Sequence, residues 1–217
     1  MKKLISIIIA ATLFSSFAFA KKYKGDIQLN MGISTEEMKV KDDVDMTAKS
    51  GMFEFDVQTW HLFGINDWFS VGFMAGFNTG TGLTIEMDNV DSDDLQVAAH
   101  INFLLGPAVG FDVGKVVRFD VAAGIDFGLL SMYSYQHPTA SSKVLAPYCS
   151  PVGIGFQGQA KFLPKAKVSP IVSYRITSDF ANTLYVYDQD ENEHHDTSVD
   201  SINVVNSAFT VGISFNW

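Results

Sequence analysis

The sequence predicts an all-β protein, an eight-stranded antiparallel up-and-down β-barrel that crosses a membrane through its strands. Three observations support this prediction: an apolar chain without a long apolar stretch, repeated alternation of apolar and polar residues, and connections of alternating length. Hydrophobic residues make up 47% of the 217 residues, with 18 Phe and 17 Gly. The most apolar stretch after the amino terminus, 97–111, is shorter than the roughly 20 residues that a spanning helix needs. A closed barrel is the other structure that pairs every backbone polar group within lipid.

The amino-terminal segment is expected to lie outside this fold. Two lysines precede an apolar run at 4–14, and a small-x-small cleavage motif ends at Ala20. This order of features is that of a secretory signal peptide. We therefore expect residues 1–20 to be removed on export and residues 21–217 to form the barrel.

The first four predicted strands place apolar residues on one face and polar or small residues on the other. Segments 26–33 and 53–58 alternate aliphatic or Phe side chains with Asp, Gln, Asn and Glu. Segment 69–78 alternates Phe, Val and Ala mainly with Ser, Gly and Asn. Segment 96–105 alternates Val, Ala, Ile, Phe and Leu with Gln, Ala, His and Asn. Each run has the period of two that a strand requires.

The last four predicted strands show the same period. Segment 117–127 sets Val, Phe and Ile against Arg, Asp and Gly, and segment 152–162 sets Val, Ile and Phe against Gly, Gln and Lys. Segment 168–177 sets Val, Tyr and Ile against Ser, Arg and Thr. Segment 208–217 ends on alternating apolar residues and is expected to close the barrel against 26–33. Trp217 is expected in an aromatic girdle near Trp68.

The connections between these strands are alternately short and long. The short ones carry turn residues at 64–67, 112–115 and 164–167, and the long polar ones lie at about 35–50, 79–94, 131–147 and 179–203. Outer-membrane barrels have short periplasmic turns and longer external loops. A soluble β-sandwich also alternates. However, the apolar faces here are rich in Phe and carry no charge at the strand centres, which favours the membrane barrel.

The polar faces are expected to fill the barrel interior, because eight strands enclose a space that side chains just fill. The charged members of the predicted lumen network are Asp26, Glu54, Asp56, His100, Arg118, Asp120, Asp126, Lys161 and Arg175. Buried charges are costly unless they are paired. We therefore favour a cross-linked core that plugs the barrel, and the alternative is a narrow gated conduit in which the pairs exchange partners.

Two motifs resemble ligand sites without their required context. Gly153-x-Gly155-x-x-Gly158 has dinucleotide-binding spacing but lies within a strand and opens no helix. The segment 188–199 begins like a calcium loop, yet Glu193 and Val199 replace the glycine and glutamate that such a loop needs. No cofactor and no metal are predicted. The connections at about 79–94 and 179–203 are acidic, which disfavours binding of nucleic acid and favours basic partners or bridging cations.

A catalytic site is not predicted either. The candidates for a Ser–His–acid set are His100, His137, Ser131 and Ser134, and no spacing fixes such a set. Cys149 is the only cysteine, so it cannot form an internal disulfide. A reactive role for this thiol is less favoured than a packed or exposed cysteine without one.

The signal peptide, the eight alternating segments and the ending together resemble the small outer-membrane barrel superfamily of OmpA-like, OmpX-like and OmpW-like proteins. The ending resembles the β-signal read by the barrel-assembly machinery, and its residues are Phe209, Val211, Ile213, Phe215 and Trp217. The resemblance implies residence in the outer membrane of a Gram-negative bacterium. It also implies contact with outer-membrane lipid and lipopolysaccharide, and with the assembly machinery during biogenesis.

The resemblance leaves several functions open, because members of this superfamily act as adhesins, membrane stabilisers, narrow channels or lipid-modifying enzymes. We expect a non-enzymatic protein with a surface-interaction or envelope-stabilising role, whose acidic connections could meet host or extracellular ligands. The alternative is a narrow gated, porin-like channel for small or hydrophobic solutes. A lipid A-modifying enzyme is the less favoured third reading.

Overall fold

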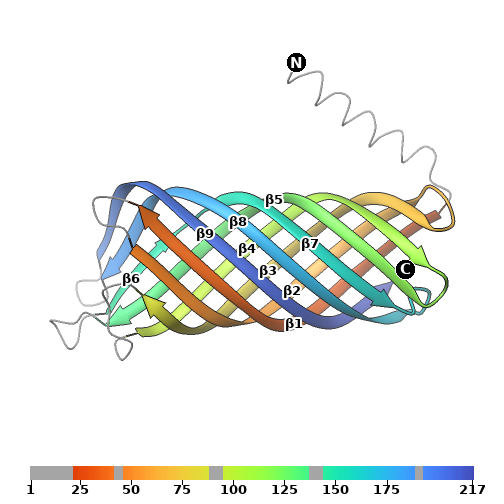
Figure 1. The fold of residues 1–217 in the computed structure, drawn as a ribbon, viewed down its shortest axis with the longest axis horizontal. Coiled ribbons are helices and arrows are strands. Elements are labelled where there is room, and N and C mark those ends of the chain that lie inside the picture. The colour runs from red at the N-terminus through yellow and green to blue at the C-terminus, as the bar shows by residue number, and fades with distance from the viewer. Residues whose placement is uncertain (1–21, 42–45, 88–94, 137–143, 189–192) are drawn as a thin grey trace, which may run out of the picture.

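The computed structural model describes residues 22–41, 46–87, 95–136, 144–188 and 193–217. The predicted signal peptide, His137 and parts of the acidic connections lie outside the described residues. The described chain forms antiparallel strands that close into a tilted tube (Figure 1). The strands are β1 (Lys22–Lys41), β2 (Met46–Gly64), β3 (Phe69–Met87), β4 (Leu95–Val113), β5 (Val117–Gln136), β6 (Val144–Cys149), β7 (Val152–Phe162), β8 (Val168–Asp188) and β9 (Glu193–Asn216).

The wall has eight positions, which confirms the predicted all-β, eight-stranded fold. β6 and β7 share one position, since both pair with β5 on one side and β8 on the other. Ser150 and Pro151 separate these two strands. The ring closes between β1 and β9, from Asp26 opposite Asn216 to Ile33 opposite Phe209 and beyond. No helix long and apolar enough to span a bilayer occurs among the described residues.

An apolar belt covers the outer surface next to the short turns. Ile33 of β1 lies opposite Phe53 on β2 and Phe209 on β9, and all three side chains are exposed. The next outward-facing residues along the wall are polar, as Thr35 and its register partner Ser207 show. A sharp change from apolar to polar marks the edge of a lipid-facing surface. The belt and the closed ring place the barrel in the outer membrane.

The prediction of four long polar loops is wrong, because strands continue through most of these segments. β1 has 20 residues, and only about 9–11 residues are needed to cross a membrane. At a rise of about 3.3 Å per residue and a tilt of roughly 40°, β1 reaches about 50 Å, twice the height of an apolar band of about 25 Å. We call the part of the wall beyond the belt the extension. It comprises about 34–41, 46–52, 79–87, 95–99, 131–136, 144–149, 181–188 and 193–207.

The extension inverts the polarity of the belt. Lys39 points outward, whereas Met38 and Val40 point inward and are buried. Together with residues from β2, β4, β5, β6 and β9 they form an apolar core inside the extension: Met38, Val40, Ala48, Met52, Ala98, Tyr133, Cys149, Val199, Ile202 and Val204. This inversion explains the wrong prediction. The alternation is present here, but charged outward residues make the segments look like loops.

The turn end of the barrel agrees with the predicted short connections. Gly114, between β4 and β5, has a φ of 65°, a conformation that glycine adopts without steric cost. Figure 1 shows the carboxyl terminus at this same end. Trp217 and Trp68 contact different rings there: Trp217 lies edge-on to His61, with ring centroids 6.5 Å apart, and Trp68 lies 6.3 Å from Phe111.

Candidate functional site: the barrel lumen

All nine predicted lumen residues are buried in the structure, and they fall into two groups along the barrel axis. The central group contains Glu54, Asp56, His100, Asp126 and Arg175. The group near the short turns contains Asp26, Arg118, Asp120 and Lys161. Strand alternation accounts for this placement, since each residue lies on the strand face opposite to the apolar belt.

A chain of charge contacts forms the centre of the lumen. His100 on β4 lies between two carboxylates, with Nδ1 3.0 Å from Glu36 Oε2 and Nε2 3.1 Å from Glu54 Oε2. Each ring nitrogen therefore lies beside a carboxylate oxygen, an arrangement that favours the doubly protonated imidazolium form of the ring. Arg175 on β8 continues the chain by pairing with Glu54 and with Asp56, whose Oδ1 is 3.1 Å from Nη1.

Glu36 is a central residue that the sequence analysis missed. The sequence places Glu36 in the predicted connection at about 35–50. In the structure it lies on β1, with 2% of its surface exposed. Ser131 donates a hydrogen bond of 2.6 Å to Glu36 Oε1, and the Tyr133 hydroxyl donates one of 3.2 Å to its backbone carbonyl. The alternation of Glu36 with Met38 and Val40 is the sequence signal that could have found it.

Asp179 on β8 was missed for the same reason. Asp179 and Asp126 on β5 are both register partners of Gly153 on β7, so the two residues lie on either side of this glycine. A Cβ on Gly153 would lie 2.4 Å from Asp179 Oδ1, so glycine is needed for this approach.

Among the described residues, the catalytic candidates His100 and Ser131 are not arranged as in a Ser–His–acid triad. His100 and Ser131 are register partners on β4 and β5, so the fold does bring them together. The carboxylate of Glu36 lies between them, however: its Oε1 accepts a hydrogen bond from Ser131, and its Oε2 is 3.0 Å from His100 Nδ1. In a triad the histidine lies between the serine and the acid, where it can take the serine proton. In this order His100 is not placed to take the proton of Ser131.

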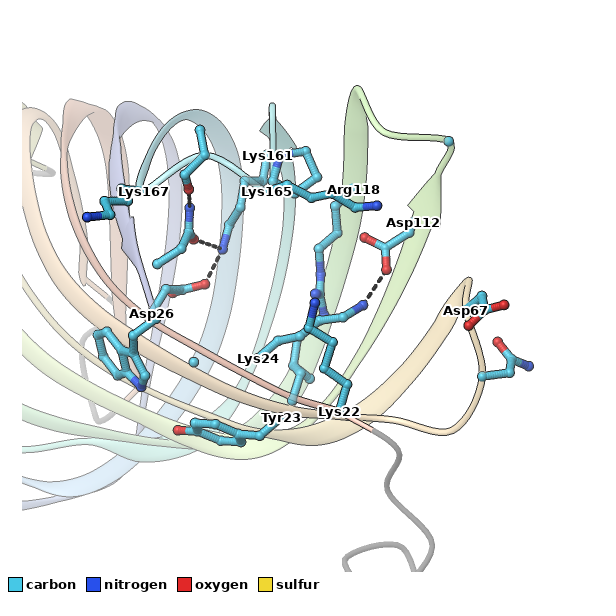
Figure 2. Close-up of a pocket in the computed structure, with 18 residues that line it drawn as sticks. Lys22, Tyr23, Lys24, Asp26, Asp67, Asp112, Arg118, Lys161, Lys165 and Lys167 are labelled. Carbon is cyan, nitrogen blue, oxygen red and sulfur yellow. Dashed lines mark hydrogen bonds and ion pairs between the residues drawn. The ribbon is translucent and has the colours of Figure 1, made fainter.

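The part of the lumen near the short turns combines a charged side and an apolar side. On the charged side, Lys161 pairs with Asp26 (Figure 2). Arg118 Nε donates to Asp120 Oδ1 at 2.5 Å. Gln159 also donates to Asp120 at 2.9 Å. The other side is an apolar cluster that sequence analysis did not name: Trp60, Leu62, Met74, Leu104, Ala108 and Ala122.

Side chains therefore fill the lumen in successive layers. The apolar core occupies the extension, the contacts of Glu36, His100 and Arg175 occupy the centre, and the Trp60 cluster with the Asp26–Lys161 pair lies toward the short turns. Gln157 and Gln58 bridge opposite walls through a hydrogen bond of 2.5 Å. Within the described residues no group of three or more His, Cys, Asp or Glu side chains could hold a metal ion.

Four residues of the predicted β-signal lie on β9, and the fifth, Trp217, directly follows this strand. Their side chains are all exposed on the outer surface: Phe209, Val211, Ile213, Phe215 and Trp217. Backbone hydrogen bonds join Trp217 and Gly25 in both directions, so the pairing with β1 continues to the last residue. Recognition of this segment by an assembly machinery stays a prediction.

Comparison with known proteins identifies the fold. No family model matches the chain, and no curated protein matches it by sequence. Among solved structures, the outer membrane protein OprG from Pseudomonas aeruginosa is similar with a TM-score of 0.52 and 9% identity, over 89% of this chain and 96% of that one. A major outer membrane protein from Thermus thermophilus is similar with a TM-score of 0.52 and 10% identity, over 90% and 100% of the two chains.

The outer membrane protease OmpT from Escherichia coli is also similar, with a TM-score of 0.46 and 9% identity over 91% of this chain and 97% of that one. At such low identities the two likenesses with a TM-score of 0.52 show the fold alone. The chain thus has the fold of the small outer-membrane β-barrels, as its sequence predicts. The absence of enzymatic activity stays a prediction.

Proposed function

We propose that the protein is a non-conducting, non-enzymatic barrel that presents its extension outside the cell, for surface interaction or for stabilising the envelope. The extension is the observation that carries this proposal. Strands about twice as long as the membrane requires, packed around an apolar core, form a rigid body rather than free loops. Such a body can carry a binding surface at a fixed height above the lipid.

The filled lumen supports the non-conducting part of the proposal. Three layers of buried side chains fill the barrel from the extension to the short turns. The salt-bridged layer resists rearrangement because separating its charges costs about 3–5 kcal/mol. Purified protein in planar bilayers should therefore stay silent. Steady unit currents would contradict the proposal.

A surface role can be tested in cells with a variant that lacks part of the extension. Replacing residues 39–47 by Asn-Gly joins Met38 to Ala48, which are register partners on β1 and β2. In a deletion strain, the full chain should restore detergent resistance or adhesion to immobilised matrix protein, and the shortened chain should not, although it inserts equally well. Equal restoration by both chains would overturn the role of the extension.

A narrow gated channel is the second candidate, and the contacts of Arg175 favour it. This cation pairs with both Glu54 and Asp56, so it could shift between them as charges move along the lumen. This reading predicts unit currents in the wild type that disappear when Arg175→Gln removes the shared cation. Silence in both proteins would exclude this second reading.

A further inference from the structure

A cavity of about 480 Å³ lies inside the barrel at its turn end (Figure 2). It is large enough for a small ligand. Six basic and three acidic side chains line it, an excess of three positive charges in a chain whose formal net charge is −9. The basic residues are Lys22, Lys24, Arg118, Lys161, Lys165 and Lys167.

Two of the three acids are already paired with two of the lysines. Lys24 pairs with Asp112, and Lys161 pairs with Asp26. In the part of the chain that the structure describes, no ion pair involves Lys22, Lys165 or Lys167. These three lysines are exposed at the rim, so their charge is available to a ligand that enters the cavity.

Arg118 supplies a buried donor in the wall of the cavity. Its side chain is 5% exposed, and its Nε donates to Asp120 Oδ1, but among the described residues its Nη2 has no hydrogen-bond partner. A buried guanidinium nitrogen without a partner costs free energy, and Arg118 belongs to the lining of the cavity. Gly110 makes room for this group, since a Cβ there would lie 2.4 Å from Nη2.

We propose that this cavity binds a phosphate-bearing anion. The Arg118 guanidinium matches the oxygens of a phosphate group, and the rim lysines add charge from several directions. Leu62, which is buried, adds apolar surface to the lining. The phosphate could belong to a small soluble ester or to a phospholipid headgroup, because the exposed Tyr23 and Trp217 rings stand where the barrel wall meets the membrane interface.

Calorimetric titration can test binding and separate these two sources. One arm titrates glycerol 3-phosphate, with sodium acetate as a competitor, into protein held in a zwitterionic detergent. The other arm measures binding of the same protein to vesicles of phosphatidylcholine with and without phosphatidylglycerol. The test variants are Arg118→Gln and the double variant Lys165→Gln/Lys167→Gln. The control is Lys115→Gln, which removes an exposed lysine at the same end that does not line the cavity.

Binding of glycerol 3-phosphate should weaken about tenfold in Arg118→Gln and severalfold in the double lysine variant, with no change in Lys115→Gln. Because Lys165 and Lys167 are exposed, their variant should fold even if Arg118→Gln does not. Saturable binding in the first arm assigns a soluble ester, and variant-sensitive binding in the vesicle arm alone assigns the headgroup. Equal competition by acetate, equal loss in the control, or no binding in either arm would overturn the proposal.

Discussion

At the scale of single residues, His100 is the group on which the central network depends. One ring nitrogen of His100 contacts Glu36 of β1, and the other contacts Glu54 of β2. All three side chains are buried. Neither glutamate could stay charged there at low cost without a cation beside it. The network therefore links the extension to the membrane-embedded part of the wall.

Replacing His100 by Ala should lower the free energy of unfolding by about 3–5 kcal/mol, because two buried carboxylates lose their shared cation. The unfolding midpoint in urea, followed on gels by the difference between heated and unheated protein, measures this loss. Adding Glu36→Gln to the variant should recover part of the stability. If the single variant unfolds at the wild-type urea concentration, the contacts of His100 contribute nothing.

Two glycines of β7 offer a matched comparison. A Cβ on Gly153 would lie 2.1 Å from the Ser178 carbonyl oxygen, whereas a Cβ on Gly158 meets no atom within 4 Å. Gly153→Ala should therefore destabilise the barrel by about 1–3 kcal/mol, the usual cost of overpacking, and Gly158→Ala should leave it unchanged. The same urea unfolding series measures both. Equal midpoints for the two variants would contradict the close approach of β7 and β8 at Asp179.

At the scale of strands, the belt could be predicted from sequence and the extension could not. Period-two alternation with Phe on one face shows where a strand faces lipid, as in 69–78 and 209–217. In the extension the same period appears with charge outside and apolar residues inside, for example in Glu37, Met38, Lys39 and Val40. Without knowing the register of neighbouring strands, this pattern cannot be told from a polar loop with scattered apolar residues.

The sequence could predict which residues point into the lumen, but not which of them contact one another. Alternation places Asp26, Glu54 and Arg175 inside, yet it does not say which of them meet. Partners such as Lys161 and Asp26 are 135 positions apart in the chain. Their contact depends on the tilt and stagger of the closed barrel, which no local pattern contains.

Substitutions at two neighbouring positions of β1 can test whether the extension has apolar residues inside and charged residues outside. Val40→Asp places a carboxylate in the apolar core of the extension and should cost about 3–5 kcal/mol, as an unpaired buried charge does. Lys39→Asp changes a side chain that faces water and should change stability by less than about 0.5 kcal/mol. Resistance of the folded barrel to proteolysis gives an independent measurement. If both variants resist equally, residues 39–40 behave as a loop.

At the scale of the whole molecule, the short turns and the extension lie at opposite ends of the barrel. In outer-membrane barrels the short turns face the periplasm. This orientation puts the cavity of Arg118 inside the envelope and the extension outside the cell. It also puts Lys39 and Lys115, both exposed, on opposite sides of the membrane.

Single cysteines can test this orientation in intact cells. In a Cys149→Ala background, Lys39→Cys should react with a membrane-impermeant maleimide, and Lys115→Cys should react only after the outer membrane is opened. Both variants should label equally in purified protein, which controls for local reactivity. Labelling of Lys115→Cys in intact cells, with Lys39→Cys protected, would reverse the orientation.

The change of polarity between Ile33 and Thr35 also determines how deep the barrel sits in the membrane. Moving the wall outward would expose Phe53 and Phe209 to water, and moving it inward would bring Glu37 and Lys39 into lipid. Both displacements cost free energy around the whole circumference, so the barrel has a single preferred depth. Two rows of side chains thus hold the external surface at a constant distance from the lipid headgroups.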